Sequence, residues 1–512
     1  MGIGLDRISN LPDSILEFIL SLVPLKSAVR TSILAKRWRN LWLYKLSSTF
    51  VLDFDEEFSG SQSPTEFVTV VDRYLQLCSN DKLERLRIFF CPFDRFAPNI
   101  ERWVKFAETK GVQELDLDLS QGHRDPRNGE FTDERKPFKL PASLFGCESL
   151  TNLSLSRCDF CTPSEFKRLG CLRLLILSHV NINDDMLQSI LTECPILESL
   201  SLKNCSQLRN VHVSGDDLRL ERFTMVDCLK VYYLEISAPK LQSLILFGNL
   251  NFMFRFIDIS SLVDAFLSSI GRETYGNCTM FLPDLAHVKI LSFALSYVAE
   301  FEEPEENEAE FTIPLPNLQE LQMLVDVMSE ENISQIYRFF HIYPSPFLEK
   351  LLIRLPGYLE DPTGTEYIPT ALNQPTNVVF DHLKEIKLSN FRGCILEMRL
   401  VKFLLEKAIT LERLVLIAPP MELNEGIKSD QVGLSLQSKF SERIGLRIIR
   451  GQLSTLPKAS LNVSIVVQEF FEDDMSLNPV HREVYCEQSF SSIQKMFEPS
   501  FEEFVSAQSE FL

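Results

Sequence analysis

Among the residue types that can do chemistry, cysteine is the one whose spacing in this sequence most resembles that of a known kind of site. Among twelve cysteines, Cys158 and Cys161 are separated by two residues, which is the spacing of half a zinc site. A structural zinc site needs a second such pair, and none occurs at ligand spacing. The cysteines also lack the regular spacing of a small disulfide scaffold. The sequence therefore predicts reduced, structural cysteines and no bound metal.

The histidines and short motifs do not form an enzyme site. The histidines are scattered without a ligand-like pair, at His123, His179, His212, His287, His341, His382 and His481. No Gly-rich phosphate loop, H-E-x-x-H or G-x-S-x-G motif occurs. We therefore expect structural roles for the histidines, and a non-catalytic protein without a cofactor.

The charge of the chain is unevenly distributed. The net charge is −20, yet residues 1–50 hold seven Lys or Arg against three acids and so carry +4. The remaining 462 residues carry −24, which makes nucleic acid a poor partner. Residues 300–310 contain seven glutamates and are interpreted as a solvated insertion loop, with contact to a basic target as the alternative.

No segment of the sequence predicts a membrane partner. The most apolar stretch, residues 244–257, is short and is broken by Asn249, Asn251 and Arg255. The N-terminus lacks a signal segment, and Asp6 stands where a myristoylation motif needs Ser or Thr. The expected location is the nucleus, the cytoplasm or both.

Three short helical segments are predicted near the N-terminus. The first covers residues 13–23, the second covers about residues 26–36, and the third contains Trp38 and Trp42 on one face. The apolar residues of the first segment cover more than one helix face. A segment of about 40 residues cannot bury that much apolar surface by itself. Some of this surface must therefore contact another chain or, alternatively, the rest of this chain.

The same residues carry a family resemblance. DRISNLPDSIL at residues 6–16, ILSL at 19–22 and VRTSILAKRWRNLW at 29–42 resemble a plant F-box, with Ala35 where close relatives usually carry Ser. The resemblance implies a small three-helix domain that binds a Skp-type adaptor and, through it, cullin and RING subunits. It also implies that eight residues contact the adaptor or brace the helices that do: Leu11, Pro12, Ile15, Leu16, Ile19, Val29, Ile33 and Trp38.

A second pattern, L-x-x-L-x-L with apolar substitutes, recurs through the body of the chain. Its first residues are Leu83, Val112, Leu150, Leu172, Leu197, Leu220, Leu241, Leu285, Leu318, Leu348, Leu383 and Leu411. Between Leu150 and Leu241 the intervals are 22, 25, 23 and 21 residues, within the range of leucine-rich repeats. The interval of 44 residues before Leu285 indicates a degenerate repeat, and later intervals of 33, 30, 35 and 28 indicate insertions.

Each repeat is expected to form a short strand with inward leucines, then a turn and a returning helix. One unit cannot bury its apolar face alone, so neighbours stack into an array with a parallel sheet on its concave side. Cys158, Cys205 and Cys228 each follow the last apolar position by three residues, and Asn249 takes that position in the next unit. These side chains are therefore expected to pack under the turn of the repeat.

The concave strands are also the predicted target-binding surface. Side chains there project from a rigid sheet and lose little entropy on contact. The exposed residues that alternate with inward leucines are expected to form part of that surface, and examples are Ser154, Ile176, Ser201 and Ser243.

The last part of the chain resembles the FBD module that closes many plant F-box/leucine-rich-repeat proteins. The resemblance rests on a strand and Gly break at residues 383–393, an amphipathic helix at 397–408, a strand at 411–417 and LPKAS at 456–460. It implies a capped end of the array and no chemistry.

The predicted fold is therefore multidomain, with a small all-α F-box followed by an α/β leucine-rich-repeat solenoid that an FBD module closes. The expected boundaries are 1–50 for the F-box, 51–82 for a linker helix region, 83–372 for the solenoid, 373–470 for the FBD module and 471–512 for an acidic tail.

This architecture implies the substrate-recognition subunit of an SCF-type (Skp–cullin–F-box) ubiquitin ligase, which contributes proximity and no bond-making groups. Two alternatives stay open. One is a hormone co-receptor of the same architecture, gated by a small molecule in a cavity rimmed by Arg or Lys. The other is an interaction scaffold that recruits no ligase. A ligase that carried ubiquitin itself would need an activated thiolate, for which Cys486 is the least constrained candidate.

Overall fold

The structure is a computed structural model that divides into two compact units, residues 1–240 and 241–512. It describes residues 8, 11–23, 25–43, 50–60, 62–90, 94–120, 137–159, 169–215, 217–248, 250, 253–269, 282–294, 312–325, 327–356, 378–419 and 449–469. Within these ranges no helix has the length and apolar character needed to span a membrane.

Short helices form the N-terminal module of the first unit. They are α1 (Asp13–Ser21), α2 (Leu25–Arg30), η1 (Thr31–Ile33) and η2 (Lys36–Asn40). α1 begins after Pro12, which suits a position where the backbone N–H has no helical partner. The second expected helix is divided into α2 and the 3₁₀ turn η1. The buried core of the module consists of Leu16, Leu20, Ala28 and Trp38.

A parallel sheet forms the body of the first unit. Its strands, in spatial order, are β1 (Val51–Phe54), β2 (Arg85–Phe89), β3 (Glu114–Asp118), β5 (Asn152–Ser156), β7 (Leu174–Ser178), β8 (Ser199–Lys203) and β10 (Arg222–Val226). The repeat leucines are in register, so that Leu86 lies opposite Leu115 and Leu115 opposite Leu153. The shared register places every second side chain of each strand in the buried core.

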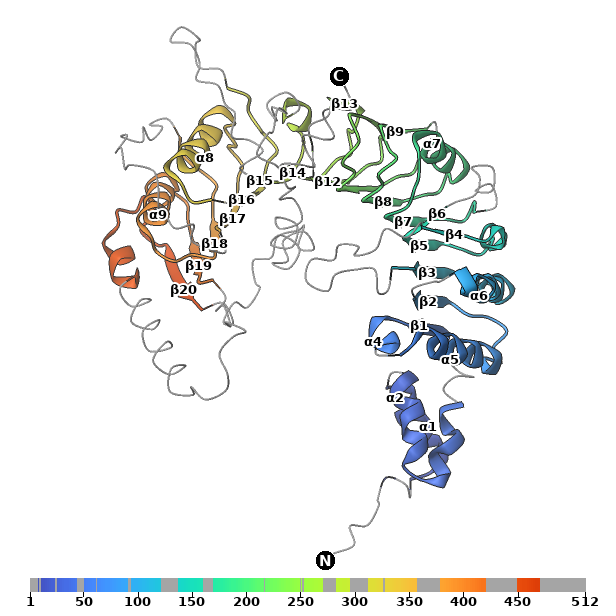
Figure 1. Cartoon of the computed structure of the whole chain (residues 1–512). Helices are drawn as coiled ribbons and strands as arrows, with labels where there is room; N and C mark the ends of the chain where they lie inside the picture. The colour runs from blue at the N-terminus through green and yellow to red at the C-terminus, as the bar shows by residue number, and fades with distance from the viewer. Residues whose placement is uncertain are drawn as a thin grey trace, which may run out of the picture. The chain divides into compact units, whose positions relative to one another are not determined.

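Helices cover one face of this sheet. The connections contain α4 (Glu56–Ser59), α5 (Pro64–Leu77), η3 (Asp94–Phe96), α6 (Ala97–Thr109), β4 (Phe138–Lys139), η4 (Ala142–Gly146), β6 (Cys158–Asp159) and α7 (Asp184–Glu193). Figure 1 shows α5, α6 and α7 on the same side of the strands. The opposite face is called here the outer face.

The region expected to be a linker before the solenoid is already part of the sheet. Strand β1 pairs in parallel with β2 along its whole length, with Leu52 opposite Leu86 and Phe54 opposite Ile88. Helix α5, which follows β1, buries Phe67 and Val71 against the same core. The expected boundary at residue 83 therefore falls one repeat too late, because β1 lacks the leading leucine by which the pattern was found.

Two repeats of the first unit carry a strand where a returning helix was expected. β9 (Asn210–Ser214) and β11 (Tyr233–Ser237) pair in parallel on the side away from the main strands. Val211 and Val213 alternate with polar residues, which is a period-two pattern typical of a strand. The prediction of a returning helix in these two repeats is therefore wrong.

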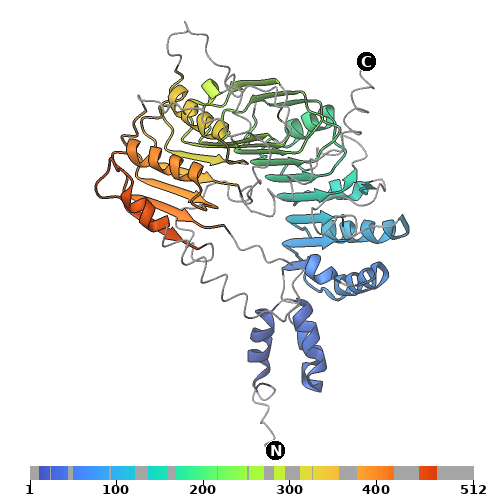
Figure 2. The same ribbon diagram turned by 60° about the vertical axis from the view of Figure 1, so that its left-hand side comes forward.

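Parallel strands also form the body of the second unit. Its strands, in spatial order, are β12 (Ser243–Gly248), β14 (Asp264–Ser269), β15 (Ile290–Ala294), β16 (Glu320–Leu324), β17 (Lys350–Arg354), β18 (Glu385–Ser389), β19 (Arg413–Ile417) and β20 (Ser464–Gln468). The other elements are β13 (Met253–Asp258), η7 (Leu282–Leu285), α8 (Glu330–Ile342) and α9 (Ile395–Lys407). Figures 1 and 2 both show α8 and α9 on one side of these strands.

The degenerate repeat expected between Leu241 and Leu285 is confirmed as strand β14, with Ala265 and Leu267 inward. The frame assigned to the next repeat is wrong. Strand β15 begins at Ile290 and pairs so that Leu291 lies opposite Ala265 and Phe293 opposite Leu267. Leu285, which was taken as the start of that repeat, lies in the 3₁₀ helix η7 instead.

Candidate functional site

The eight residues implied for adaptor contact divide between the core and the surface of the N-terminal module. Leu16 and Trp38 are buried in its core, and Leu11 packs against them. Ile19 and Val29 are half-buried, whereas Pro12, Ile15 and Ile33 are exposed. The buried members can brace the module but cannot touch a partner without unfolding. The exposed members are therefore the ones that are free to make a contact.

An apolar surface extends beyond the residues that the resemblance implies. Ile15, Phe18 and Leu22 share one face of α1 and are 44%, 63% and 70% exposed. Two further members follow in the next helices, where Ile33 is 85% and Leu34 is 67% exposed. Phe18, Leu22 and Leu34 were absent from the expected set, although the excess of apolar residues in the first helical segment was the signal for two of them. We call these five residues the apolar stripe.

The apolar stripe lies on a braced framework. Arg37 donates two hydrogen bonds to Asp13 Oδ1, from Nε at 2.9 Å and from Nη2 at 2.6 Å. This pair joins η2 to the first turn of α1. Trp38 of η2 is 4% exposed and belongs to the same core cluster as Leu16 and Leu20 of α1. The orientation of α1 relative to η2 is therefore fixed within the module itself.

The module also contacts the first repeat. The Trp42 and Tyr74 rings meet edge to face with centroids 5.9 Å apart. The Lys26 ammonium donates to the Phe58 carbonyl at 2.9 Å and lies over the Phe58 ring. Burial in this aromatic contact raises the pKa of Tyr74 to about 12. The basic residues of the module are thus partly used to attach it to the body of the unit.

The cysteines of the repeats occupy the predicted packing position. Cys158, Cys205 and Cys228 are buried, each two residues after the end of strand β5, β8 or β10. The Cys205 thiol donates to the carbonyls of Lys203 and Leu177 at 3.6 and 3.7 Å. Burial holds the pKa of Cys158 well above its usual range, so this thiol stays protonated.

The zinc hypothesis has no support from the described residues. Within the ranges given above, no three His, Cys, Asp or Glu side chains gather in a metal-binding cluster. Cys161 lies outside the described residues, as do Asn249, Cys486, the glutamates of residues 300–310 and the tail.

Three of the four residues predicted to bind a target form one row on the outer face. Ser154 lies opposite Ile176, and Ile176 lies opposite Ser201, on strands β5, β7 and β8. Each of these side chains is half-buried. The Ser201 Oγ is shielded from water and has no hydrogen-bond partner. Ser243 lies elsewhere, at the first position of β12 in the second unit, and donates to Asp264 Oδ1 at 2.6 Å.

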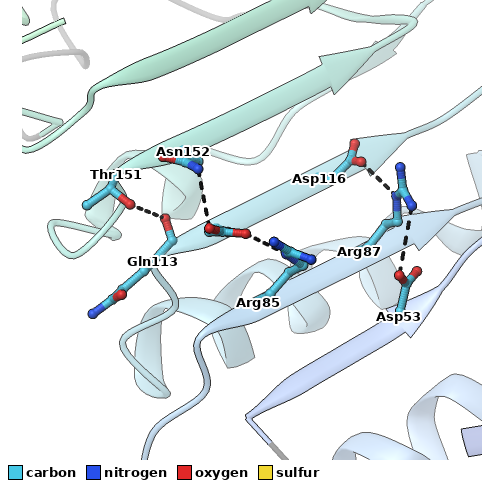
Figure 3. Close-up of polar contacts among 8 residues, drawn as sticks. Asp53, Arg85, Arg87, Gln113, Asp116, Thr151 and Asn152 are labelled. Carbon is cyan, nitrogen blue, oxygen red and sulfur yellow. Dashed lines mark hydrogen bonds and ion pairs between the residues drawn. The ribbon is translucent and has the colours of Figure 1, made fainter. Parts of the chain in front are cut away.

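A network of charged side chains continues this outer face onto β1, β2 and β3. Figure 3 shows Arg87 between Asp53 and Asp116, with Nε 2.9 Å from Asp116 Oδ2 and Nη1 3.8 Å from Asp53 Oδ2. In the row beside it, Arg85 Nε lies 2.5 Å from Glu114 Oε2. We call these five residues the charged network.

The charged network was not predicted from the sequence, although the sequence of its strands contains a signal for it. The charged residues of RLRIF in β2 and ELDLD in β3 alternate with inward leucines, so they had to face outward. What the sequence could not give is the pairing between strands. Opposite charges are neighbours here because Arg85 aligns with Glu114 and Arg87 with Asp116 in the sheet register.

Two pKa shifts follow from the same arrangement. Burial raises the pKa of Asp53 above its ordinary value, and the Arg87 guanidinium opposes that shift. The hydrogen bond from Arg85 to Glu114 raises the pKa of Arg85. A hollow of about 190 Å³ lies over the charged network, with Ser154 and Leu174 also in its lining. The surface therefore offers both signs of charge beside apolar patches, which suits the recognition of a protein segment.

Comparisons with known proteins agree with this architecture. A family model described as the LRR domain of At1g61320/AtMIF1 matches residues 77–440, and the F-box domain model matches residues 8–47. The chain is 27% identical over 491 residues to F-box/LRR-repeat protein 13 of Arabidopsis thaliana, covering 90% of this chain and 96% of that protein.

Two further Arabidopsis thaliana relatives carry FBD in their names. F-box/FBD/LRR-repeat protein At1g78750 is 25% identical over 497 residues, covering 90% of this chain and 96% of that protein. F-box/FBD/LRR-repeat protein At1g13570 is 33% identical over 206 residues, covering 40% of this chain and 45% of that protein. Because the repeat model alone matches more than half of the sequence, the chain belongs to the plant F-box/leucine-rich-repeat family.

Proposed function

We propose that this chain is the substrate-recognition subunit of an SCF-type ubiquitin ligase and is not itself an enzyme. Its F-box binds a Skp-type adaptor and, through the adaptor, cullin and RING subunits. Its repeats bind a target protein, in the nucleus, the cytoplasm or both. The apolar stripe is the observation that carries this proposal, because it lies within residues 8–47, which match the F-box domain model.

The energetics of the apolar stripe favour a permanent protein partner. Its five members are between 44% and 85% exposed in a module whose own core is already filled by Leu16, Leu20, Ala28 and Trp38. Each large apolar side chain gains roughly 1.5–3 kcal/mol on complete burial. Several exposed large apolar side chains on one small folded module are typical of a protein interface.

The target is proposed to bind the outer face of the first unit. Strands β2 to β8 hold their outward side chains in fixed rows, so a partner orders few groups when it binds. The charged network supplies selectivity because a partner must match its pattern of both charges, and the row of Ser154, Ile176 and Ser201 supplies a less charged surface. The role of this subunit is then to place the target near a ubiquitin-charged enzyme.

The end of the second unit is proposed to be an FBD module. Strand β18, helix α9 and strand β19 follow one another, and β20 is the last described strand beside β19. Two Arabidopsis thaliana relatives with FBD in their names support this assignment. The proposed role is to cover the last repeat, which would otherwise expose its apolar face.

The alternative function, a hormone co-receptor, would need the hollow over the charged network to bind a small molecule, and two features of the hollow argue against this. Arg85 and Arg87 do line it, as an acidic small molecule would require. Both guanidinium groups, however, are already paired with Glu114 and Asp116. Its volume of about 190 Å³ is also below the roughly 300–1,000 Å³ of most ligand sites.

The test of adaptor binding uses exposed residues, so that folding is preserved. We expect Ile15→Asp combined with Ile33→Asp to weaken binding to a purified Skp-type adaptor by at least about 30-fold, because two buried charges would lack partners. Leu461→Asp is the matched control, since Leu461 is 93% exposed and lies in the second unit. Binding is measured by titration calorimetry on the full chain. An unchanged affinity in the double variant would remove the apolar stripe as the adaptor surface.

A further inference from the structure

A second hollow of the first unit lies at the carboxyl ends of its parallel strands. The residue that follows β5, β7, β8 or β10 has a left-handed backbone, with φ of 54° at Arg157, 54° at His179, 53° at Asn204 and 52° at Asp227. The N–H groups of the first three donate to carbonyls of the neighbouring strand at 2.8–2.9 Å. These bonds keep the four residues in one row, with neighbours about 4.8 Å apart.

The row lines a cavity of about 310 Å³, together with Pro137, Asn181, Ser206, Leu229 and Lys230. This volume reaches the lower end of the roughly 300–1,000 Å³ of small-ligand sites. None of its lining residues belongs to the apolar stripe, the charged network or the row of Ser154, Ile176 and Ser201. The cavity is therefore separate from the surfaces used in the proposed function.

Asp227 is the unusual member of this lining. Its side chain is 6% exposed, and its Oδ1 has no hydrogen-bond partner. Burial raises the pKa of Asp227 to about 7. A buried carboxylate without a cation or donor is costly, and the cost disappears when a partner with hydrogen-bond donors arrives.

The cations that line the cavity do not serve as that partner. Lys230 is exposed, and burial is the cause of the Asp227 pKa shift, with no contribution from the Lys230 charge. Arg157 stands three strand spacings from Asp227 in the row, which is roughly 14 Å. The described residues therefore supply no cation that pairs with Asp227.

We propose that this cavity binds the cationic group of a ligand, an alkylguanidinium or alkylammonium, with the Asp227 carboxylate as its counter-ion. Such a cationic group forms short, charge-assisted hydrogen bonds to a carboxylate. The alkyl chain that carries the group is narrow and apolar. The amide side chains of Asn181 and Asn204 complete the polar lining, and Leu229 supplies an apolar wall. The same chemistry is offered by a small amine and by an Arg or Lys side chain of a protein.

Binding is coupled to proton release from Asp227. The cation needs the ionised carboxylate, so affinity rises with pH through the range in which Asp227 ionises. With half-ionisation near pH 7, the dissociation constant is about tenfold larger at pH 6 than at pH 8. The other titratable or charged groups at this site are His179, Lys230 and Arg157, with the Cys228 thiol beside Asp227. His179 is the one whose ordinary titration falls in the same pH range.

The test uses n-propylguanidinium as the probe and n-propylurea as its neutral counterpart of the same shape. Titration calorimetry on the full chain is expected to detect the guanidinium and not the urea. The affinity for n-propylguanidinium should be about tenfold lower at pH 6 than at pH 8. Binding should also release protons from Asp227, which the buffer takes up. Asp227→Asn should abolish binding, and it should fold because Asn tolerates a left-handed backbone. Asp217→Asn, at an exposed neighbouring acid outside the cavity lining, should retain binding and its pH dependence.

A second probe separates the two sources of the cation. The blocked peptide acetyl-Gly-Arg-Gly-amide should bind more tightly than n-propylguanidinium if the ligand is a protein side chain, and no better if the ligand is a small amine. The proposal is overturned if wild-type protein binds neither cation, if Asp227→Asn binds them as well as wild type, or if inorganic phosphate binds more tightly than both.

Discussion

At the scale of single residues, burial gives Asp227 a linkage between pH and stability. Its pKa is about 7 in the folded chain, against an ordinary value of 3.8. Between these two pH values the unfolded chain is ionised at this position while the folded chain stays protonated. The folded state then binds more protons, so its stability falls as pH rises from about 4 to about 7 and stays low above that.

We expect Asp227→Asn to relieve this loss. The variant's free energy of unfolding minus that of wild type should be about 2 kcal/mol larger at pH 8 than at pH 5.5. Urea unfolding of both proteins at the two pH values measures the difference. Asp217→Asn is the control, because Asp217 is exposed and should show no such gain. A gain that does not change with pH would contradict the linkage.

Burial also determines which cysteines can react. Cys158 is 0% exposed and its pKa is raised well above the usual range by burial, whereas Cys171 is exposed. The thiolate is the reactive form, so Cys158 should resist alkylation in the folded chain. We expect Cys171→Ser to remove one N-ethylmaleimide adduct from the native protein, as measured by intact mass, and Cys158→Ser to remove none. Rapid loss of an adduct in Cys158→Ser would show that the turn of this repeat opens.

At the scale of elements, helix α9 depends on one buried carboxylate. Glu397 Oε2 accepts hydrogen bonds from the N–H groups of Arg392, Gly393 and Cys394 at 2.8, 2.6 and 3.2 Å. Gly393 has a φ of 77°, a conformation that suits glycine. Burial raises the pKa of Glu397, although the three N–H groups oppose that shift. The turn after β18 and the first turn of α9 are therefore held by a single side chain.

Removal of the Glu397 side chain should destabilise the folded protein. We expect Glu397→Ala to lower the free energy of unfolding by about 3 kcal/mol, because three N–H groups of a half-buried turn lose their charged acceptor. Glu406→Ala is the control on the same helix, since Glu406 makes a 3.8 Å pair with Lys402. The control should cost less than about 1 kcal/mol. Equal losses in the two variants would argue against the capping role of Glu397.

At the scale of the whole molecule, the proposal assigns adaptor and target to different surfaces. The apolar stripe lies in residues 15–34, and the proposed target surface lies on strands β1 to β8. The two surfaces share no residue. Changes on one surface should therefore leave binding on the other intact.

Paired variants test this separation. We expect Ile176→Arg with Ser201→Arg to lose the target in affinity purification under proteasome inhibition, while adaptor binding stays unchanged. Ile15→Asp with Ile33→Asp should give the opposite result. Deletion of residues 302–310 should leave target capture intact, because an acidic segment would add only a salt-sensitive attraction. If the deletion alone removes the target, the binding surface lies on the glutamate-rich segment.

The sequence by itself determined the modular plan of this protein. The repeat leucines recur because each strand needs the same inward side chains, so a local pattern was enough to find most of the repeat strands in both units and the degenerate repeat at β14. The F-box motif was likewise contiguous, and the F-box and repeat matches confirm the family it indicated. The positions of Cys158, Cys205 and Cys228 followed from the same periodicity.

Tertiary structure alone decided which side chains share a surface. Strand β1 and the frame of β15 are fixed by pairing with neighbouring strands, and that pairing depends on residues about 30 positions away. The ion pairs of the charged network and the burial of Asp227 arise in the same way, between repeats and not within one. A local pattern shows which face a residue takes, but contact across strands depends on register, which the sequence of one strand does not contain.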